Sequence, residues 1–296
     1  MKNTMDSKIT TNLRLLGTGA ADWKEEPARS EILKAKELGG RNIRRLCSLF
    51  IPPDTIIDFT SDTMKALHDY DIDENSIHNI IITHGHSDHF QPIEIMDFAA
   101  HLSHPLTVYG NIMVKNALDF IFRNRWNNSK GNFEVTDKSS NIQVKTVSPE
   151  KSFYIGKVKI TPVLANHMID KTYFILEQQA LNYILEFEGK TLFYGLDSSF
   201  VLPQTFDVLK HYRFDIAIFD ATFGYKEIDS AKSGHQNFSM LKNTIAQFRT
   251  ANLFQKQAMI IASHMSLHYV APYDEIAGEL EKEGIILAYD GMVIEF

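Results

Sequence analysis

Short apolar runs alternate along this chain with longer segments in which apolar residues recur every three or four positions. The short runs are rich in β-branched and aromatic residues and are bordered by Gly, Pro or Asp, which is typical of strands. They predict strands at 12–17, 47–51, 55–59, 79–83 and 106–110, and a second set at 158–165, 173–177, 182–195, 214–220, 258–263 and 284–296. Within 182–195 and 284–296, Glu188-Gly189 and Asp290-Gly291 predict hairpin turns.

Helical periodicity predicts helices among the strands in both halves of the chain, at 61–70, 92–102, 111–124, 236–250 and 273–282. Two strand-rich sets with interspersed helices are typical of two packed sheets with helices outside them. The pattern therefore predicts an α/β fold in which two mixed sheets form a sandwich.

Two segments depart from this pattern. Residues 22–45 form a charged, helix-like insertion between the first two strands, and residues 124–142 are polar, which predicts a surface arm or loop. The chain has 296 residues, a length that a large two-layer α/β fold can reach as one unit. We therefore expect a single domain over 1–296.

Charge and composition narrow the range of partners. The net charge of −7 argues against a broad basic face for nucleic acid or an anionic membrane, but a few local cations can still hold a small anionic substrate. The single cysteine, Cys47, excludes an internal disulfide and a cysteine-rich zinc cluster. No stretch approaches the roughly 20 apolar residues of a membrane span, so we expect a cytoplasmic protein without a membrane partner.

The sequence THGHSDH at 83–89 crowds histidines and an aspartate onto the turn that follows a predicted strand. Protonated imidazoles would repel one another there, whereas a bound cation needs neutral imidazoles as donors. The spacing lets His84 and His86 converge on one ion while Asp88 and His89 point to a second. Imidazole and carboxylate donors without thiolate suit zinc, manganese or iron.

One turn cannot complete two metal sites, so further ligands must come from other strand ends. His167, Asp197 and His264 each follow an apolar run in the second half of the chain. Any one of them alone could be an ordinary surface or hydrogen-bonded residue. Together with the cluster at 84–89, they favour a metal site at a shared edge of the sheets.

The order of these motifs resembles the metallo-β-lactamase superfamily, over nearly the whole chain from LLGTGAA at 15–21 to the C-terminus. The resemblance implies an αββα sandwich with two divalent metal ions, Zn or Mn, at one edge. It implies His84, His86 and His167 on the first metal, Asp88, His89 and His264 on the second, and Asp197 as the bridge between them. Asp58 in TIIDF matches an acidic residue that orients the site from outside the metal shell.

The stretch 219–240 carries a second likeness. Its DAT and GHQN elements resemble the phosphodiesterase branch, which includes the tRNA 3′-processing endonuclease and the phosphoribosyl cyclic phosphodiesterase. The resemblance places His235 opposite the scissile phosphate, and Asp220 could orient it. Alternatively, His235 is only a residue at the start of a helix and Asp220 only a cap at the end of a strand.

The opening LGTGAA, the pair Arg44-Arg45 before CSLFI and the ending AYDGMVIEF resemble the cyclic phosphodiesterase more than the tRNA enzyme. The cyclic phosphodiesterase family often has a structural zinc bound by cysteines in the segment that corresponds to residues 22–45, which in this chain are charged and helix-like. The tRNA enzyme usually has a flexible basic arm, whereas residues 124–142 of this chain are only weakly basic. The fork of a guanidinium matches phosphate geometry, so Arg44 or Arg45 could hold a substrate phosphate. Both could instead be solvated surface residues.

These observations predict a metal-dependent hydrolase that cleaves a phosphodiester bond in a small or cyclic sugar or nucleotide phosphate. Attack by metal-bound hydroxide would break the bond, with His235 as general acid or phosphate clamp. The alternatives are an acyl hydrolase of the same fold acting on a lactone, thioester or β-lactam, an RNA-processing endonuclease, and a non-catalytic metal-binding module. The net negative charge of the chain disfavours an RNA substrate. The resemblance also implies a homodimer.

Overall fold

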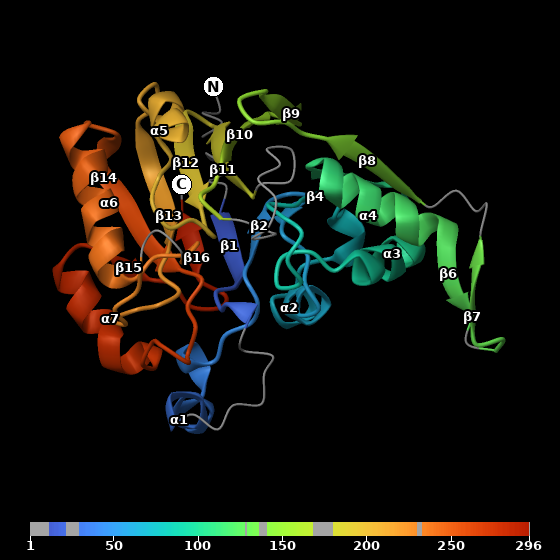
Figure 1. Ribbon diagram of the computed structural model, residues 1–296, viewed down its shortest axis with the longest axis horizontal. Helices are drawn as coiled ribbons and strands as arrows, with labels where there is room; N and C mark the ends of the chain where they lie inside the picture. Colours follow the sequence, from blue (N-terminus) through green and yellow to red (C-terminus); the bar gives the residue numbers. More distant parts are fainter. Residues whose placement is uncertain are drawn as a thin grey trace, which may run out of the picture.

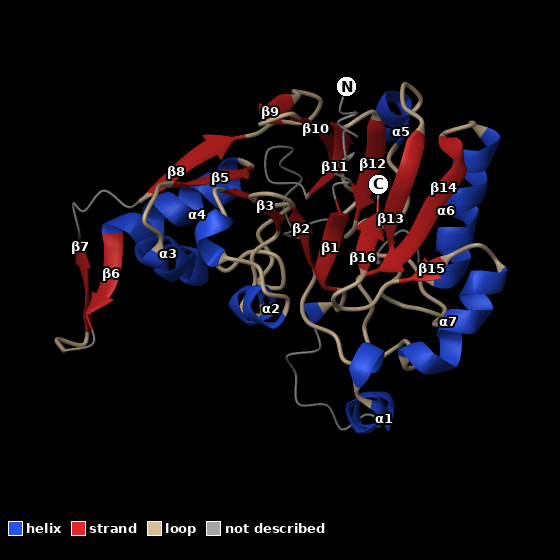
Figure 2. Cartoon of the chain, turned by 180° about the vertical axis from the view of Figure 1, so that it is seen from behind, coloured by secondary structure: helices blue, strands red, loops and turns tan. Residues whose placement is uncertain are grey.

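The computed structural model describes residues 12–21, 30–127, 129–135, 141–167, 180–229 and 233–295. Within them the chain forms two seven-stranded sheets that pack face to face, with helices on both outer faces, as Figures 1 and 2 show. This arrangement confirms the predicted α/β sandwich of two mixed sheets. None of the helices in these ranges is both long enough and apolar enough to span a membrane.

The first sheet is built almost entirely from the N-terminal half of the chain. Its strands, in spatial order, are β16 (Val293–Glu295), β1 (Asn12–Gly17), β2 (Ser48–Ile51), β3 (Thr55–Ile57), β4 (Asn79–Ile81), β5 (Leu106–Gly110) and β8 (Ile142–Thr146). Neighbours are antiparallel from β16 to β3 and parallel from β3 to β8.

The second sheet has the same mixture of directions. Its strands, in spatial order, are β15 (Ile286–Leu287), β14 (Phe254–Ser263), β13 (Phe214–Asp220), β12 (Lys190–Gly195), β11 (Leu181–Phe187), β10 (Val158–Leu164) and β9 (Phe153–Ile155). The strands from β15 to β12 are parallel, and those from β12 to β9 are antiparallel. Since β10 and β12 flank β11 on opposite sides, they run in the same direction and end at the same edge.

Each sheet has its own helices. The α-helices are α1 (Ser30–Leu38), α2 (Thr63–Asp69), α3 (Pro92–His101), α4 (Ile112–Arg123), α5 (Pro203–Leu209), α6 (Phe238–Thr250) and α7 (Tyr273–Lys282), and short 3-10 turns occur at Gly40–Asn42 and Glu74–Ser76. Buried side chains of α2, α3 and α4 pack on the outer face of the first sheet, and those of α5, α6 and α7 pack on the second. The apolar stripes of these six helices are thus buried against a sheet face, whereas Ile32 and Ala35 of α1 pack with Leu267.

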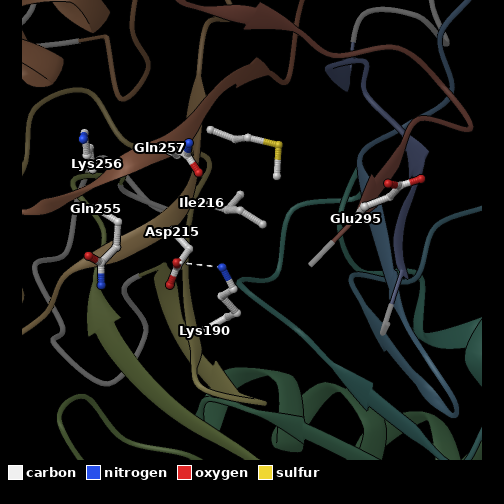
Figure 3. A pocket seen from close by; sticks show the side chains of 8 residues that line it. Lys190, Asp215, Ile216, Gln255, Lys256, Gln257 and Glu295 are labelled. Atoms are coloured by element: carbon white, nitrogen blue, oxygen red, sulfur yellow. Dashed lines mark hydrogen bonds and ion pairs between the residues drawn. The ribbon is translucent and has the colours of Figure 1, made fainter. Parts of the chain in front are cut away.

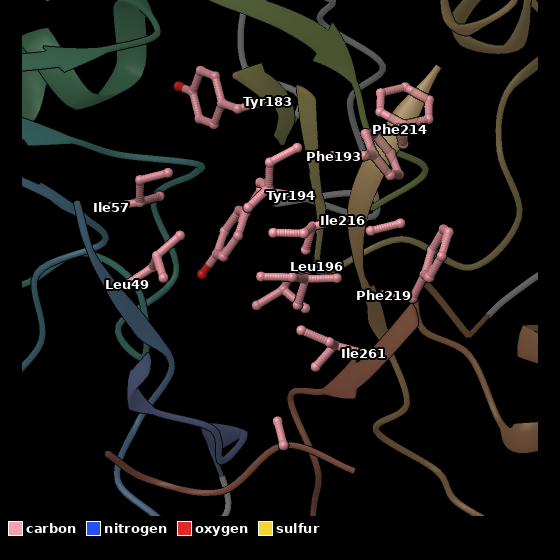
Figure 4. Close-up of a cluster of buried hydrophobic side chains, with 14 of the residues drawn as sticks. Leu49, Ile57, Tyr183, Phe193, Tyr194, Leu196, Phe214, Ile216, Phe219 and Ile261 are labelled. Carbon is pink, nitrogen blue, oxygen red and sulfur yellow. The ribbon is translucent and has the colours of Figure 1, made fainter. Parts of the chain in front are cut away.

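The main core lies between the two sheets (Figure 4). Leu49 and Ile57 of the first sheet face Tyr183, Tyr194 and Leu196 of the second, and all five are buried. Full burial of a large apolar side chain contributes on the order of 1.5–3 kcal/mol. The alternation of side chains along each strand directs every second residue into this core.

The sheets are also joined by a polar contact next to the histidine cluster. The hydroxyl of Tyr183 in β11 donates a hydrogen bond of 2.8 Å to the carbonyl of Ile82, and the amide of Leu181 donates one of 3.0 Å to the carbonyl of Thr83. These bonds hold the start of β11 against the turn that carries the cluster.

The predicted hairpin at 284–296 is wrong. The chain does turn at Asp290-Gly291, with the amide of Met292 bonding to the carbonyl of Tyr289, but β15 belongs to the second sheet and β16 to the first. The segment crosses between the sheets because β16 pairs with the free edge of β1. By contrast, β11 and β12 form the hairpin predicted at 182–195.

Other departures concern short elements. The structure adds α5 and strands β8 and β9, which the periodicity did not predict, and the strand predicted at 173–177 lies outside the described residues. The segment 124–142 contains an antiparallel pair, β6 (Asn124–Asn127) and β7 (Asn132–Val135), which projects from the body in Figure 1. The charged segment 22–45 contains α1 and the turn at Gly40–Asn42.

Candidate metal centre

The candidate ligands all follow the ends of strands, as the sequence predicts. The cluster at 84–89 follows β4, and His167, Asp197 and His264 follow β10, β12 and β14. The carboxyl ends of parallel strands meet at one edge of a sheet, which is where open α/β folds bind their ligands. The two sheets therefore bring residues from distant parts of the sequence to a common edge.

Backbone conformation helps to turn these side chains toward one another. Asp58, Asp197 and His264 have φ angles of 62°, 48° and 57°, in the left-handed region that few residues other than glycine adopt. Each lies one or two residues beyond the end of its strand. Such strained residues cluster at functional sites, where the surrounding structure holds them in place.

One group of ligands consists of three histidines. The Nδ1 atom of His86 lies 3.0 Å from Nε2 of His84 and 3.0 Å from Nε2 of His167. These three ring nitrogens are close enough to one another to hold a single metal ion. The structure thus brings together the three histidines that the sequence predicts for the first metal.

A second group combines one carboxylate with two histidines. The Nε2 atoms of His89 and His264 are 3.1 Å apart, and Oδ2 of Asp88 lies 3.4 Å and 3.5 Å from them. All three side chains are buried. They match the residues that the sequence predicts for the second metal.

Asp197 lies between the two groups. Its Oδ1 atom is 3.9 Å from Nε2 of His84 and 3.7 Å from Nε2 of His167, whereas its Oδ2 atom is 2.9 Å from Nε2 of His89 and 3.3 Å from Nε2 of His264. One carboxylate oxygen therefore faces each group. A bridging ligand requires this arrangement, and the bridging role itself stays a prediction.

Four of the histidines use their second ring nitrogen in a hydrogen bond to the protein. These pairs are His84 with Thr83 Oγ1 at 3.0 Å, His89 with Asp58 Oδ2 at 2.7 Å, His167 with Gly234 O at 2.9 Å, and His264 with Thr222 Oγ1 at 2.8 Å. Such partners fix the ring orientation and leave the other nitrogen directed toward a metal. Asp58 thus has the geometry expected of an orienting residue.

The protonation of His84, His167 and Asp197 also suits a metal site. Burial lowers the pKa of His84 well below its usual value and that of His167 to about 4, so both rings are neutral at pH 7. Burial by itself would raise the pKa of the Asp197 carboxyl group, but the nearby His264 and His89 hold that pKa well below its usual range. Neutral imidazoles and ionised carboxylates are the forms that coordinate cations.

The donor set therefore fits divalent metal ions. Oδ2 of Asp197 is buried and accepts no hydrogen bond of good geometry from the described residues, although two histidine nitrogens lie beside it. A shared cation would satisfy this oxygen and remove the repulsion between the facing nitrogens. The nitrogen and oxygen donors, without thiolate, are those that Zn and Mn accept.

Asp220 and His235 form a separate pair beside these groups. Oδ2 of Asp220 lies 2.8 Å from Nδ1 of His235, and its Oδ1 accepts hydrogen bonds from the amides of Thr222 at 3.0 Å and Gln236 at 2.9 Å. Burial by itself would lower the pKa of His235, but Asp220 raises it to about 9, so the imidazole is protonated at pH 7. Asp220 therefore both caps the turn after β13 and contacts His235.

Some residues at the site had no role in the sequence prediction. Thr83 and Thr222 bond to ligand histidines, and Gly234 accepts a hydrogen bond from His167. Gly234 has a φ of 65°, and a Cβ atom there would lie 2.9 Å from Nδ1 of His167. DAT and GHQN contain Thr222 and Gly234, but the motif letters alone do not show which histidine each contacts.

Arg44 and Arg45 are not among the groups that surround the candidate ligands. Arg44 is 3% exposed, so it is not a solvated surface residue, and it bonds to Thr18 and to the carbonyl of Ala288. Arg45 contacts Asp69 and the hydroxyl of Tyr70. Their predicted role in holding a substrate phosphate stays a prediction.

A cavity of about 710 Å³ lies elsewhere, at the opposite ends of the strands (Figure 3). Lys190, the first residue of β12, and Asp215, the second residue of β13, line it together with residues of β14 and Glu295. Because it contains none of the candidate ligands, we do not assign the chemistry to it. His268, the next histidine in the chain after His264, is likewise absent from the ligand groups that the described residues form.

A family model described as Anti-Pycsar protein Apyc1 matches residues 52–254. None of the curated protein sequences matches the chain significantly. Among solved structures, a diphosphatase of the PhnP family is 19% identical, with a TM-score of 0.71 over 97% of this chain and 98% of the other. Zinc-bound PqqB from Methylobacterium extorquens is 15% identical, with a TM-score of 0.72 over 96% and 100% of the two chains.

The short form of human tRNase Z is 19% identical and gives a TM-score of 0.62 over 96% of this chain and 98% of the other. A Bacillus subtilis protein described as having the metallo-β-lactamase fold, YhfI, gives a TM-score of 0.69 over 97% and 100% of the two chains, at 15% identity. At these identities the likeness establishes the fold, which is the metallo-β-lactamase fold predicted from the motif order.

Proposed function

Because this chain belongs to the Anti-Pycsar protein Apyc1 family and has the metallo-β-lactamase fold, we propose that it is a metal-dependent phosphodiesterase. Its substrate is a small or cyclic phosphodiester of a sugar or nucleotide. The fold alone does not select this reaction, because one fold serves many chemistries. The proposal rests on the side chains at the edge of the sheets.

Two divalent ions, Zn or Mn, would occupy the site. His84, His86 and His167 would hold one, Asp88, His89 and His264 the other, and Asp197 would contact both. Bound there, they would supply an activated water and polarise a phosphoryl oxygen. Zinc in the structurally similar PqqB supports this choice of metal.

The contact between His235 and the buried carboxylate of Asp220, beside the ligand groups, is the observation that carries the assignment. The Nδ1 atom of His235 lies 2.8 Å from Asp220 and 3.7 Å from Oδ1 of Asp197. With Nδ1–H directed at Asp220, Nε2–H is the donor available to a phosphate oxygen or to the departing alkoxide. Cleavage of a phosphodiester requires such a proton or cation at the leaving oxygen.

Asp220 would keep His235 charged and fix its orientation, because the carboxylate is buried and held by two backbone amides. General-acid assistance of this kind contributes about 10²- to 10⁴-fold in rate. Acyl hydrolysis has less need for it, since loss of a phenolate or thiolate requires little protonation. The pair therefore favours a phosphodiester over a thioester, whereas a lactone and a β-lactam, which release an alkoxide and an amine, would also require a proton.

A direct comparison of substrates tests the proposal. Protein reconstituted with Mn or Zn should hydrolyse bis(p-nitrophenyl) phosphate faster than p-nitrophenyl acetate, and a panel of linear and cyclic phosphodiesters should contain a better substrate. Preference for the acetate would reverse the assignment in favour of an acyl hydrolase. Binding of two metal equivalents without any turnover would instead indicate a non-catalytic module.

Two substitutions separate the roles of the site residues. With an alkyl or cyclic phosphodiester, whose leaving alkoxide needs a proton, His235→Ala should lower kcat by about 10²- to 10⁴-fold and leave metal content unchanged. Asp197→Ala should remove most bound metal, measured by elemental analysis after dialysis. An unchanged kcat in the first variant, or full metal content in the second, would contradict the corresponding role.

A further inference from the structure

A second cavity, of about 420 Å³, lies beside the turn that precedes β2. It is lined by residues of the segment 40–45, of α2 and of the crossing between the sheets, namely Gly40, Ile43, Arg44, Arg45, Asp62, Lys65, Tyr70 and Asp290. None of them belongs to the candidate metal ligands or to the Asp220–His235 pair. The cavity is therefore built from a separate set of side chains.

Arg44 is the unusual residue of this cavity. It is 3% exposed, and its Nη1 atom donates to Thr18 Oγ1 at 2.6 Å and to the carbonyl of Ala288 at 2.8 Å. Its Nε and Nη2 atoms are buried and have no acceptor among the described residues. Burial lowers the pKa of Arg44 only to about 10, so the side chain remains a cation at pH 7.

The two unsatisfied nitrogens are neighbours on the guanidinium. Nε and Nη2 form the side edge of the fork, whose two parallel N–H bonds match two oxygens of a phosphate. A buried cation whose donors lack partners costs several kcal/mol. An oxyanion at this edge would offset that cost by supplying charge and acceptors together.

The nearby carboxylates do not supply these acceptors. Oδ1 of Asp290 accepts from Thr18 Oγ1 at 2.8 Å, and its Oδ2 accepts from the backbone amide of Arg45. Oδ2 of Asp62 accepts from the amide of Leu46 at 3.0 Å. Both acids are thus directed at donors other than Arg44.

Two further cationic side chains, Arg45 and Lys65, line the cavity together with Tyr70. Arg45 donates to the hydroxyl of Tyr70 at 2.8 Å, and both Arg45 and Lys65 contact Asp69. The side chain of Lys65 is 69% exposed, so it can move from Asp69 to an incoming anion without loss of packing. The cavity is therefore lined both by the buried Arg44 and by Lys65, a cation nearer to solvent.

We propose that this cavity is a phosphate-binding site distinct from the metal centre, in which the Nε and Nη2 atoms of Arg44 hold two oxygens of one phosphate group. Lys65 contributes a third contact from the solvent side. The ligand is either free inorganic phosphate or the phosphate of a small phosphomonoester. Since the site uses no metal ligand, it binds its anion whether or not the proposed phosphodiesterase activity is correct.

Calorimetric titration of metal-free protein with inorganic phosphate, at constant ionic strength, tests the proposal. Removing the metals first eliminates phosphate binding through the metal ions. We expect one site, with affinity reduced at least tenfold in Arg44→Gln and about threefold in Lys65→Gln. The matched control is Lys242→Gln on α6, a lysine that pairs with Glu283 outside the cavity, and it should bind as the unmodified protein does.

A parallel titration with ribose 5-phosphate distinguishes the two sources of the phosphate group. Affinity at least tenfold above that of inorganic phosphate identifies a phosphomonoester as the ligand, and equal affinity identifies the free anion. Either result supports the site, whereas absence of binding by both compounds overturns it. Unchanged phosphate affinity in Arg44→Gln also overturns it.

Arg44→Gln could fail to fold, because its Nη1 bonds connect β1 to the segment after β15. Crystals of the unmodified protein soaked in tungstate provide an independent measurement, since tungsten scatters anomalously and mimics phosphate. An anomalous peak within hydrogen-bonding distance of Nε and Nη2 of Arg44 supports the proposal. A peak only at the histidines, or none, refutes it.

Discussion

Thr222 connects the two parts of the candidate site through one hydroxyl group. Its Oγ1 atom lies 2.8 Å from Nδ1 of His264, 3.2 Å from Nδ1 of His235 and 3.2 Å from Oδ2 of Asp220. It thus touches a candidate metal ligand and both members of the candidate acid pair. The hydroxyl oxygen can accept the Nδ1 proton of His264, which leaves Nε2 of that ring free to coordinate.

Thr222→Val should therefore weaken metal binding about 10- to 100-fold, because the loss of a hydrogen-bonding partner of a ligand histidine has effects of this size. Titration of the metal against a competing chelator would measure the change. Thr222→Ser keeps the hydroxyl and serves as the matched variant, which should retain most of the affinity. Equal affinities in the valine and serine variants would show that only packing matters at this position.

At the scale of single residues, the sequence predicts which side chains are candidate metal ligands better than it predicts which residues each side chain contacts. The spacing of His84, His86 and His89 suggested metal ligands, and these side chains do lie with His167, Asp197 and His264. The burial of Arg44 was not predictable, because its neighbours Thr18 and Ala288 are far away in the chain. A local pattern cannot report which distant segment covers a side chain.

At the scale of elements, α6 begins immediately after the GHQN motif. Asn237 is its N-cap, with Oδ1 accepting from the amide of Met240 at 2.9 Å and Nδ2 donating to the carbonyl of Lys226 at 2.9 Å. This side chain therefore fixes both the start of the helix and the loop after β13. His235 lies two residues before the cap, so its position depends on this junction.

Asn237→Ala should lower the free energy of unfolding by about 1–2 kcal/mol, since it removes the cap and one further hydrogen bond. Urea denaturation followed by circular dichroism would measure this loss. The control is Asn243→Ala, in the exposed part of the same helix, which should change stability by less than about 0.5 kcal/mol. A similar small change in both variants would contradict the capping role.

Most long elements were predictable because their patterns are local. The helices α2, α3, α4, α6 and α7 correspond to the predicted periodic segments, and the Glu188-Gly189 turn joins β11 to β12 as expected. The hairpin prediction failed at 284–296, where an equally good turn pair joins strands of different sheets. Turn residues specify a reversal of the chain, but the choice of partner strand depends on which edge is free.

At the scale of the whole molecule, Asp290 lies in this crossing between the sheets. It accepts hydrogen bonds from Thr18 at the end of β1 and from the amide of Arg45. Burial raises the pKa of Asp290 to about 6, so the folded protein binds this proton more tightly than the unfolded chain does. The carboxyl group therefore favours folding most below its unfolded pKa, and this contribution is lost as the pH rises to about 6.

Asp290→Asn removes this titration. Relative to the unmodified protein, the variant should gain about 3 kcal/mol in free energy of unfolding as the pH rises from about 3 to about 7, at 1.36 kcal/mol per pKa unit. Urea denaturation at a series of pH values would measure the difference. Asp97→Asn on the exposed face of α3 is the control. A difference that is constant with pH would contradict the raised pKa.

The sequence by itself determined the α/β sandwich and the chemistry of the candidate site, because alternating and helical periodicities and the spacing of histidines are properties of neighbouring residues. Only the tertiary structure decided where Asp197 stands between two groups of histidines, that Thr222 and Gly234 contact ligand rings, and that Arg44 has a buried edge without acceptors. These relations join residues far apart in the chain. They exist only after the two sheets pack and their strand ends meet at one edge.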